Sequence, residues 1–375
     1  MGYPRYVAGS PGQLEPYLTP LLATGLISTW FVEDLMLSRD DAPVKHVIQA
    51  VGSSSLEKGR AFTATVCPQC QPTIYGSYEE MYQDPNVDIV YIGTPHGLHK
   101  RNCLDAIAAG KAVFCEKAFT LNARDAKEVF VAAKEKGVYV AEAMWLRHRP
   151  VFRHIRKLLH EDKAIGEVFR AYSDFGDFQD IANLPPTSRH RNPELGAGSL
   201  LDLGIYSLTW VSMALDHRNP EQSETPSIHA FQTHLLGTEV GTSVLLQYPS
   251  SGRQGVITST HQANGFPDIL ARIQGTEGHI DVHGPGASDP IGFTIYTNYS
   301  GQPGARERER KVIKSFDYSS AERGYQYEAD NAALDVFAGR LESAIMPWAE
   351  TIRILEVMDE IRRQGGTVYV ADKEP

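Results

Sequence analysis

A lysine and a carboxylate stand side by side at the end of an apolar run. Glu116 and Lys117 follow the apolar residues 113–115 and precede a turn-and-helix signal at 120–122. Charges at the carboxyl end of a buried parallel strand lie over the crevice where open α/β sheets bind their ligands. A lysine there can hold or protonate a substrate oxygen, and the carboxylate can hold the lysine in place. The alternative is an ion pair at a strand end that faces solvent.

A carboxylate and a phenol form a second candidate pair. Asp202 and Tyr206 lie in the glycine-containing stretch 196–206. If this stretch is helical, the two residues are four positions apart and project from one face. A carboxylate beside a phenol suits proton transfer to or from an alcohol oxygen. The alternative is a helix start with an aspartate near its amino end and a tyrosine in the core.

The elements that would position Glu116 and Lys117 alternate between apolar runs and helical patterns. This alternation is typical of βαβ units and a parallel sheet. Residues 1–145 are therefore predicted to form a Rossmann-type, doubly wound domain, in which residues 1–19 are irregular. Pro20 stands where the first strand should begin and would remove a ladder donor. Strands are expected at 21–23, 44–51, 87–92, 111–115 and 138–142, with helices that include 99–109 and 123–136.

The phosphate-binding turn of such a domain should follow the first strand. Its three small-residue positions read Ala23, Gly25 and Ser28, so only the middle glycine of the fingerprint is kept. We expect the pyrophosphate to lie against the backbone at the amino end of the next helix. The residues at that position are Ala23, Gly25, Leu26 and Ile27.

The stretch after the second strand favours NADP over NAD. No Asp or Glu ends that strand, although a ribose 2′-hydroxyl usually binds such a carboxylate. The hydroxyls of Ser53 and Ser54 could instead hold a 2′-phosphate, together with Lys58 or Arg60.

Beyond residue 145 the pattern changes to consecutive strands with turn signals, which indicates an antiparallel sheet. Residues 146–375 are predicted to form an α+β domain with one broad, mostly antiparallel open sheet that binds substrate and forms a dimer. Strands are expected at 166–178, 227–236, 242–248, 255–260, 270–274, 280–283 and 292–297, and helices at 149–159, 325–341 and 349–364.

Composition excludes several classes of protein. The net charge is −10, from 36 basic and 46 acidic residues, and no basic cluster offsets it, so we expect neither nucleic acid nor a membrane surface as a partner. No apolar run approaches the ~20 residues of a membrane span, and residues 1–20 do not resemble a secretory signal. Four cysteines suit a reducing compartment, so the cytoplasm is the expected location. Cys67 and Cys70 have C-x-x-C spacing, but without a second pair we interpret them as a surface loop, and we expect no metal.

Six short motifs are spread over nearly the whole chain. They are Tyr91-Ile92-Gly93-Thr94-Pro95-His96, His99, Ala109-Gly110-Lys111, Cys115-Glu116-Lys117, Ala143-Met144-Trp145-Leu146-Arg147 and Leu201-Asp202-Leu203-Gly204-Ile205-Tyr206. Taken together, these motifs resemble the Gfo/Idh/MocA oxidoreductase family. The last motif is similar to the branch that contains dimeric dihydrodiol dehydrogenases and NADP-dependent D-xylose dehydrogenases.

The resemblance implies a role for each matching residue. Lys117 and Tyr206 would flank the reacting carbon, with Tyr206 taking the hydroxyl proton and Lys117 lowering its pKa or binding the oxygen. Asp202 would orient the substrate or the lysine, and Arg147 would position substrate where the domains meet. NADP would bind the first domain, and the open sheet would form a homodimer interface. Residues on the nicotinamide side would be Thr94, Pro95, His96, His99, Glu116 and Lys117.

Two departures from the family pattern leave alternatives open. Ala118 stands where the family has a proline, often after a cis bond. A cis bond before alanine is costlier than before proline, so either the site holds that strain or the lysine points differently. Ser54 stands where relatives often have an arginine that grips the 2′-phosphate. The leading hypothesis is an NADP-dependent dehydrogenase of an aldose such as D-xylose or of a vicinal diol. The alternatives are the same chemistry on another polyol or keto sugar, and an impaired relative that binds cofactor or acts as a scaffold.

Overall fold

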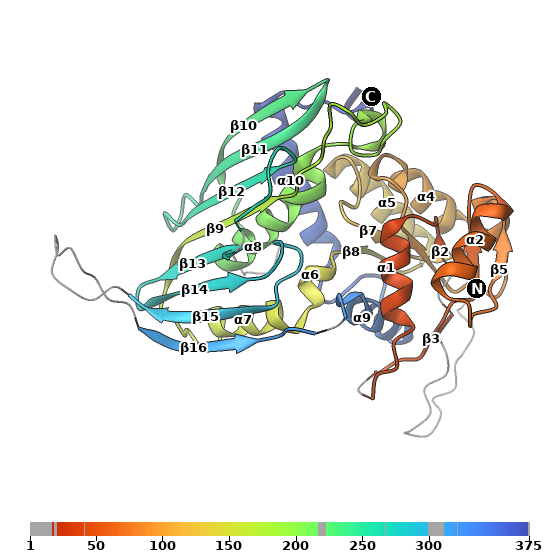
Figure 1. Ribbon diagram of the computed structural model, residues 1–375, viewed down its shortest axis with the longest axis horizontal. Coiled ribbons are helices and arrows are strands. Elements are labelled where there is room, and N and C mark those ends of the chain that lie inside the picture. The colour runs from red at the N-terminus through yellow and green to blue at the C-terminus, as the bar shows by residue number, and fades with distance from the viewer. Residues whose placement is uncertain are drawn as a thin grey trace.

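The computed structural model describes residues 17–18, 21–40, 42–216, 223–266, 268–298, 311–320 and 322–373. Two β-sheets form the framework, a six-stranded sheet from the first part of the chain and an eight-stranded sheet from the second (Figure 1). This confirms the predicted fold class. Pro20 and residues 1–16 lie outside the described residues.

The six-stranded sheet is parallel throughout and has the strand order β5-β4-β2-β6-β7-β8. Numbered along the chain this is 3-2-1-4-5-6, the order of dinucleotide-binding domains, with the crevice at β2 where the order reverses. Its central strands are runs of apolar residues because helices cover both faces. The strands are β2 (Leu21–Leu22), β4 (Ala50–Gly52), β5 (Thr73–Tyr75), β6 (Ile89–Ile92), β7 (Ala112–Glu116) and β8 (Val140–Ala143).

Five helices connect these strands. The predicted helix at 123–136 is confirmed without a shift at either end. The Asn122 side chain accepts from the backbone N–H of Asp125 at its start, and Gly137 ends it with a left-handed φ of +69°. The helices are α1 (Leu26–Leu35), α2 (Leu56–Val66), α3 (Tyr78–Tyr82), α4 (His96–Ala108) and α5 (Ala123–Lys136).

The amino-terminal part of this sheet differs from the prediction. The single strand expected at 44–51 divides into β3 (His46–Val47) and β4. β3 pairs with β1 (Tyr17–Leu18), so the segment expected to be irregular contributes one short strand. Strand β5 was not predicted because it has only three residues, none of them fully buried. Cys67 ends α2 and is completely buried, rather than lying in a surface loop as expected.

The eight-stranded sheet has the order β10-β11-β12-β9-β13-β14-β15-β16, and only the β12–β9 pair is parallel. Strand β16 was missed because most of its residues are exposed at the sheet edge and show no apolar alternation. The strands are β9 (Val168–Gly176), β10 (Ser227–Leu235), β11 (Thr238–Gln247), β12 (Gln254–Thr260), β13 (Ala271–Gly275), β14 (Gly278–His283), β15 (Gly292–Thr297) and β16 (Val312–Asp317).

Helices cover one face of this sheet and connect it to the first. Helix α8 packs on β9 and β12, and every one of its residues is buried. Helix α9 returns to the parallel sheet, where the Asp34 carboxylate of α1 accepts the backbone N–H groups of Gly324 and Tyr325. The helices are α6 (Trp145–His148), α7 (Pro150–His160), α8 (Ile205–Leu215), α9 (Tyr325–Phe337) and α10 (Trp348–Gly365).

The segment Pro193–Leu215 corrects the expectation that no apolar run approaches the length of a membrane span. These 23 residues, with a mean hydropathy of 1.2 in their most apolar window, are long and apolar enough to span a bilayer by that measure alone. However, 94% of the window is buried inside the protein. Core helices of soluble proteins pass the same test, and α8 has the burial of a core helix.

Candidate active site

Lys117 joins the two halves of the predicted site. It follows β7, and its Nζ donates to the backbone oxygen of Asp202 at 2.7 Å and to the carboxylate Oδ1 at 3.2 Å. The same Nζ lies 4.9 Å from the centre of the Tyr206 ring. The peptide bond between Lys117 and Ala118 is cis. The structure therefore brings Lys117 together with Asp202 and Tyr206, which lie about 90 residues further along the chain.

Asp202 lies in a π-helical turn, Leu200–Gly204, that leads into α8. π-Helical turns are rare in proteins, and those that occur are often found at functional sites. Its carboxylate also accepts from Arg189 Nη2, at 3.2 Å to Oδ1 and 3.3 Å to Oδ2. Burial by itself opposes ionisation of this group. The charges of Lys117 and Arg189 outweigh it and hold the pKa of Asp202 well below its usual range. Asp202 is therefore an anion at neutral pH.

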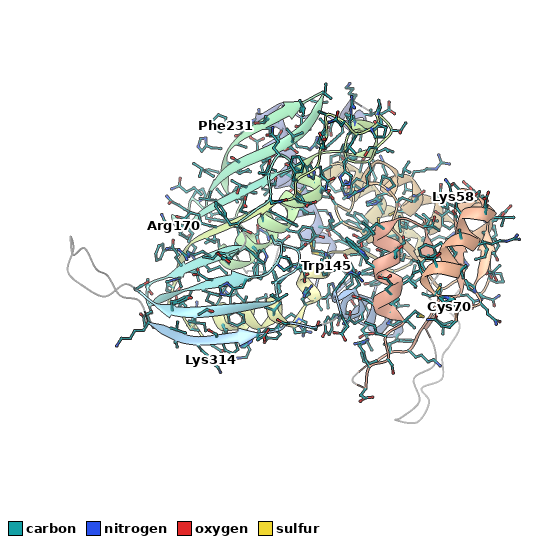
Figure 2. The ribbon with its side chains drawn as sticks, in the orientation of Figure 1. Lys58, Cys70, Trp145, Arg170, Phe231 and Lys314 are labelled. Carbon is teal, nitrogen blue, oxygen red and sulfur yellow. The ribbon has the colours of Figure 1, made fainter. Side chains whose placement is uncertain are left out.

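Tyr206 is almost completely buried, and its hydroxyl oxygen accepts from Trp145 Nε1 at 2.7 Å. Burial is the main cause that raises the pKa of Tyr206 well above its usual value, and the nearby Glu116 adds to it. The lysine was expected to lower this pKa, but desolvation dominates. Because the oxygen accepts from Trp145, its own proton is free to point elsewhere. Figure 2 shows Trp145 near the middle of the molecule, between the two sheets.

Glu116 and Glu142 brace the backbone around Lys117 from two neighbouring strand ends. Glu116 Oε1 accepts from Tyr91 Oη at 2.7 Å, and its Oε2 accepts from the Lys117 N–H at 3.2 Å. Glu142 Oε1 accepts from the Phe119 N–H at 3.1 Å. Burial raises the pKa of each carboxyl to about 7, although the groups that donate hydrogen bonds to each carboxyl lower its pKa and partly offset this effect. Both carboxyls therefore titrate near neutral pH.

The buried Glu142 carboxyl predicts a measurable pH dependence of stability. Its folded pKa of about 7 lies above the ordinary 4.5, so its contribution is present below pH 4.5 and is lost as pH rises through 7. Relative to Glu142→Gln, the wild type should lose about 2.5 kcal/mol of unfolding free energy between pH 5 and pH 8. Urea unfolding of both proteins at several pH values measures this difference.

An exposed carboxylate provides the control for that experiment. Glu161 is exposed at the end of α7, so Glu161→Gln should keep the pH profile of the wild type. A constant difference between wild type and Glu142→Gln across this pH range would mean that Glu142 is already ionised at pH 5.

Two buried histidines hold the turns on either side of Lys117. His99 contacts the backbone oxygens of Ala118 at 2.9 Å and Thr94 at 2.7 Å. His96 contacts the backbone oxygens of Gly196 at 3.1 Å and Lys117 at 3.2 Å. Burial lowers the pKa of both histidines, His96 to about 3. A neutral ring donates through one nitrogen only, so in that form each histidine makes one N–H···O bond and one further contact. These contacts tie the start of α4 to the lysine turn and to the segment before Asp202.

The other residues expected on the nicotinamide side are also near this turn. Thr94 Oγ1 accepts from Asn102 Nδ2 at 2.9 Å, and Pro95 is the N-cap residue of α4. Both follow β6, which lies beside β7 in the parallel sheet. Arg147 differs from the other candidates, because its guanidinium is engaged with the Glu350 carboxylate at 2.6 Å and the Ile345 carbonyl at 3.1 Å. These contacts hold α6 against α10, and the structure does not place Arg147 with Lys117 and Asp202.

The expected phosphate-binding turn has the geometry of an anion site. Ala23 adopts a left-handed φ of +84°, a conformation that glycine favours, and its N–H donates to the Gly52 carbonyl at 3.0 Å. Gly25 is the N-cap residue of α1, where no side chain caps the helix and no acidic residue occupies the first turn. A Cβ built on Gly25 meets no atom of the described residues within 4 Å. Leu26 and Ile27 begin the helix, so their N–H groups are at its positive end.

The expected ribose end is formed by the residues after β4. Ser53 is buried, whereas Ser54 is exposed. Ser54 Oγ accepts from Lys58 Nζ at 3.0 Å, so an ammonium group stands beside the serine expected to meet a 2′-phosphate. Ser55 caps α2, since its side chain accepts from the backbone N–H of Lys58. These residues fit a dinucleotide that carries a 2′-phosphate.

Sequence reasoning missed four residues that the structure places at this site. Trp145 lies within one of the motifs above, but no role was assigned to its indole. Arg189, His190 and His261 gave no local signal, because they come from a polar loop and from the end of β12. One ligand atom each from His190, Asp202 and His261 lies within 4.8 Å of the other two.

Comparisons with known proteins identify the family. The chain matches the Gfo/Idh/MocA description "Oxidoreductase family, NAD-binding Rossmann fold" over residues 23–144 and the C-terminal domain of the same family over residues 152–281. It is 36% identical to D-xylose 1-dehydrogenase (NADP(+)) of Hypocrea jecorina, over 93% of this chain and 92% of that protein. It is 34% identical to trans-1,2-dihydrobenzene-1,2-diol dehydrogenase of Xenopus tropicalis, over 93% and 98%.

Solved structures share the fold at low sequence identity. A levoglucosan dehydrogenase in complex with NADH and levoglucosan aligns with a TM-score of 0.78 at 17% identity, over 94% of this chain and 98% of that one. An aldose–aldose oxidoreductase from Caulobacter crescentus, complexed with glycerol, aligns with a TM-score of 0.73 at 22% identity, over the same shares. Two matching domains and relatives above 30% identity over nearly the whole chain lead to one conclusion: the chain belongs to the Gfo/Idh/MocA oxidoreductase family.

Proposed function

We propose that this protein is an NADP-dependent dehydrogenase that oxidises a hydroxyl group of a sugar such as D-xylose, or of a vicinal diol. The observation that carries the proposal is the contact of Lys117 Nζ with both Asp202 and the ring of Tyr206, at the carboxyl end of β7. Relatives that are 34–36% identical have these two activities in their names. Because Lys117, Asp202 and Tyr206 are all present and in contact, the alternative of an impaired relative that acts as a scaffold is disfavoured.

The residues of the first sheet would hold the cofactor. The uncapped start of α1 at Gly25 would hold the pyrophosphate, and Ser54 with Lys58 would hold the 2′-phosphate. When bound, NADP supplies the acceptor for the hydride that leaves the substrate carbon. The strand order places this crevice at the carboxyl ends of β2 and β6, next to the turn that carries Lys117.

Lys117 and Tyr206 would act on the substrate oxygen. The Lys117 ammonium is aimed by Asp202 and can donate to that oxygen. In reduction, the phenol of Tyr206 donates its proton to the oxygen. In oxidation, the same phenolic oxygen receives the hydroxyl proton after it has ionised. Lys117 near the ring and the Trp145 N–H on the oxygen both favour the phenolate form.

Cofactor binding and turnover test the proposal in two steps. Titration of the purified protein with NADPH and NADH, followed by nicotinamide fluorescence, should give micromolar binding for NADPH and weaker binding for NADH. NADP reduction at 340 nm, measured with D-xylose, other aldoses and trans-diols, then identifies the substrate. Binding without turnover on any of them would support the impaired-relative reading, and no binding of either nucleotide would refute the cofactor assignment.

Ser54→Arg should tighten NADPH binding by about fivefold or more, because a charge-assisted hydrogen bond to phosphate is stronger than one from a hydroxyl. Fluorescence titration gives the dissociation constants of both proteins. NADH, which lacks the phosphate, should bind the variant and the wild type equally well. An unchanged NADPH constant would place the 2′-phosphate elsewhere.

We further propose that the protein is a homodimer formed through the outer face of the eight-stranded sheet. Strand register puts Leu245, Val256, Tyr172 and Arg272 in one row across that face, opposite α8. Leu245 is 57% and Phe231 79% exposed, and Figure 2 shows Phe231 and Arg170 on the side away from the parallel sheet. A face that exposes large apolar side chains beside charged ones suits a second copy of the chain. Sedimentation equilibrium tests this, since a single monomeric mass would refute it.

A cytoplasmic location remains part of the proposal. All four cysteines are free thiols in the structure, as a reducing compartment would maintain them. Fractionation of cells that express a tagged chain tests the location, and recovery of the protein in a membrane or secreted fraction would refute it.

A further inference from the structure

Three sulfur-containing side chains meet at the carboxyl ends of α1 and α2, two helices that pack against each other. Met36 is the C-cap residue of α1, and Cys67 is the C-cap residue of α2. Cys70 Sγ donates to Met36 Sδ at 3.5 Å, and the Cys70 side chain also interacts with the Cys67 thiol. The C-x-x-C pair stood alone in the sequence, but the fold adds a thioether from another helix.

The three side chains differ in their access to solvent. Cys67 is completely buried, whereas Cys70 and Met36 are half-buried. Cys70 lines a surface groove of about 410 Å³, and Arg60 lines it too. Figure 2 shows Cys70 well apart from Trp145, on the side of the molecule that carries α2. An ion can therefore reach these sulfurs without entering the candidate active site.

The types of ligand atom favour a soft ion over zinc. Thiolate and thioether sulfurs are the ligands that select Cu⁺, whereas structural zinc sites have four ligands from Cys, His or carboxylates. In the part of the chain that the structure describes, no His, Asp or Glu forms a group of three possible ligands with Cys67 and Cys70. Two thiols and a thioether are therefore the ligand set, and Cu⁺ accepts three ligands of this kind.

The charges on the groove also suit a monovalent ion. Metal binding displaces the thiol protons, so one Cu⁺ with two thiols gives a complex of net charge −1 and releases two protons. The Arg60 guanidinium on the same groove offsets that charge.

Thiol–disulfide exchange is the other chemistry of a C-x-x-C pair, and it fits less well. Redox-active cysteines are partly exposed and have a lowered pKa. Cys67 is completely buried, and burial raises the pKa of its thiol to about 12. The Cys70 thiol donates to Met36.

We propose that Met36, Cys67 and Cys70 form a binding site for one Cu⁺ ion, which joins the carboxyl ends of α1 and α2. The inference goes beyond the proposed function and does not depend on it. Lys117, which acts on the substrate oxygen in that proposal, lies after β7, whereas the three sulfurs belong to α1, to α2 and to the turn after α2.

Titration of the reduced protein with Cu⁺ in the absence of oxygen tests the site, with bicinchoninate as the competing chelator. The wild type should bind one Cu⁺ per chain, and Cys70→Ala should not bind it. Met36→Leu conserves the side-chain volume and removes only the third sulfur. It should weaken Cu⁺ binding about tenfold or more, at least the loss caused by removing a residue that supports a metal ligand. Equal affinities of Met36→Leu and wild type, or no binding to wild type, would overturn the proposal.

The other two cysteines provide the matched control. Cys103 and Cys115 are completely buried, and their side chains also interact with each other. Cys103→Ala should therefore bind one Cu⁺ with the affinity of the wild type. Loss of Cu⁺ from Cys103→Ala, with binding kept in Cys70→Ala, would move the ion to this second pair and overturn the proposal.

X-ray absorption at the copper edge identifies the ligand atoms directly. Three sulfur neighbours are expected in the wild type and two in Met36→Leu, whereas nitrogen or oxygen neighbours in the wild type would overturn the proposal. Far-UV circular dichroism shows that each variant is folded. NADPH titration remains a separate test of the proposed function, because Cys70→Ala should bind NADPH as the wild type does. A chain that binds Cu⁺ in this way but no NADPH would refute the cofactor assignment and keep the copper site.

Discussion

Lys117→Met should lower kcat for oxidation of the preferred sugar or diol by about 10³-fold, within the range by which a positioned acid–base group usually contributes. Methionine keeps the length and the apolar stem of the side chain but removes the ammonium that Asp202 aims. Arg189 still pairs with the Asp202 carboxylate, so the variant should fold and bind NADPH within a few-fold of wild type. Initial rates at saturating NADP and a fluorescence titration with NADPH measure the two quantities.

Another ion-paired lysine provides the matched control. Lys127 on α5 pairs with Glu356 at 2.6 Å, and its side chain is 51% exposed. Lys127→Met removes a charge and an ion pair from the surface and should leave kcat unchanged. If Lys117→Met kept more than a tenth of the wild-type rate, Lys117 would not be the group that acts on the substrate oxygen.

The parallel sheet could be predicted from the sequence because its strands are short apolar runs between amphipathic helices. Lys117 and Glu116 stood out for the same reason, since a charge directly after such a run must lie at the carboxyl edge of the sheet. The edge strands β5 and β16 lacked this signal, because an edge strand that is partly exposed carries no apolar run. The division of residues 44–51 into β3 and β4 also had no local marker.

The second half of the site could be predicted only in part. The spacing of Asp202 and Tyr206 suggested one helical face, and a helical segment is present, but Asp202 lies in a π-turn that precedes α8. Arg189 and His261 reach Asp202 through tertiary packing of separate chain segments, which no local pattern encodes. The position of Arg147 also depends on tertiary packing. The sequence suggested that its side chain binds substrate, but the ion pair with Glu350 on α10 holds it elsewhere.

Tyr206→Phe should lower kcat by 10²- to 10⁴-fold while KM changes little, because the phenol acts on the reacting oxygen only when the proton moves. The ring remains, so packing against Phe175 and the contact with Lys117 should be kept. The raised pKa of Tyr206 adds a second expectation. Since oxidation requires the ionised oxygen, the wild-type kcat for oxidation should still be rising at pH 9 and should not level off near the ordinary tyrosine pKa of about 10.

Trp145→Phe removes the hydrogen bond to the Tyr206 oxygen and keeps the phenol, so its effect can be measured apart from that of Tyr206→Phe. The indole N–H stabilises the ionised form of Tyr206, so its loss should raise the pKa further and lower the oxidation rate about tenfold at pH 8. The rates of wild type and Trp145→Phe should both rise with pH up to pH 9, with the variant about tenfold lower throughout, whereas Tyr206→Phe should stay low at every pH. If the rate of Trp145→Phe were independent of pH between pH 7 and pH 9, ionisation of Tyr206 would not limit oxidation.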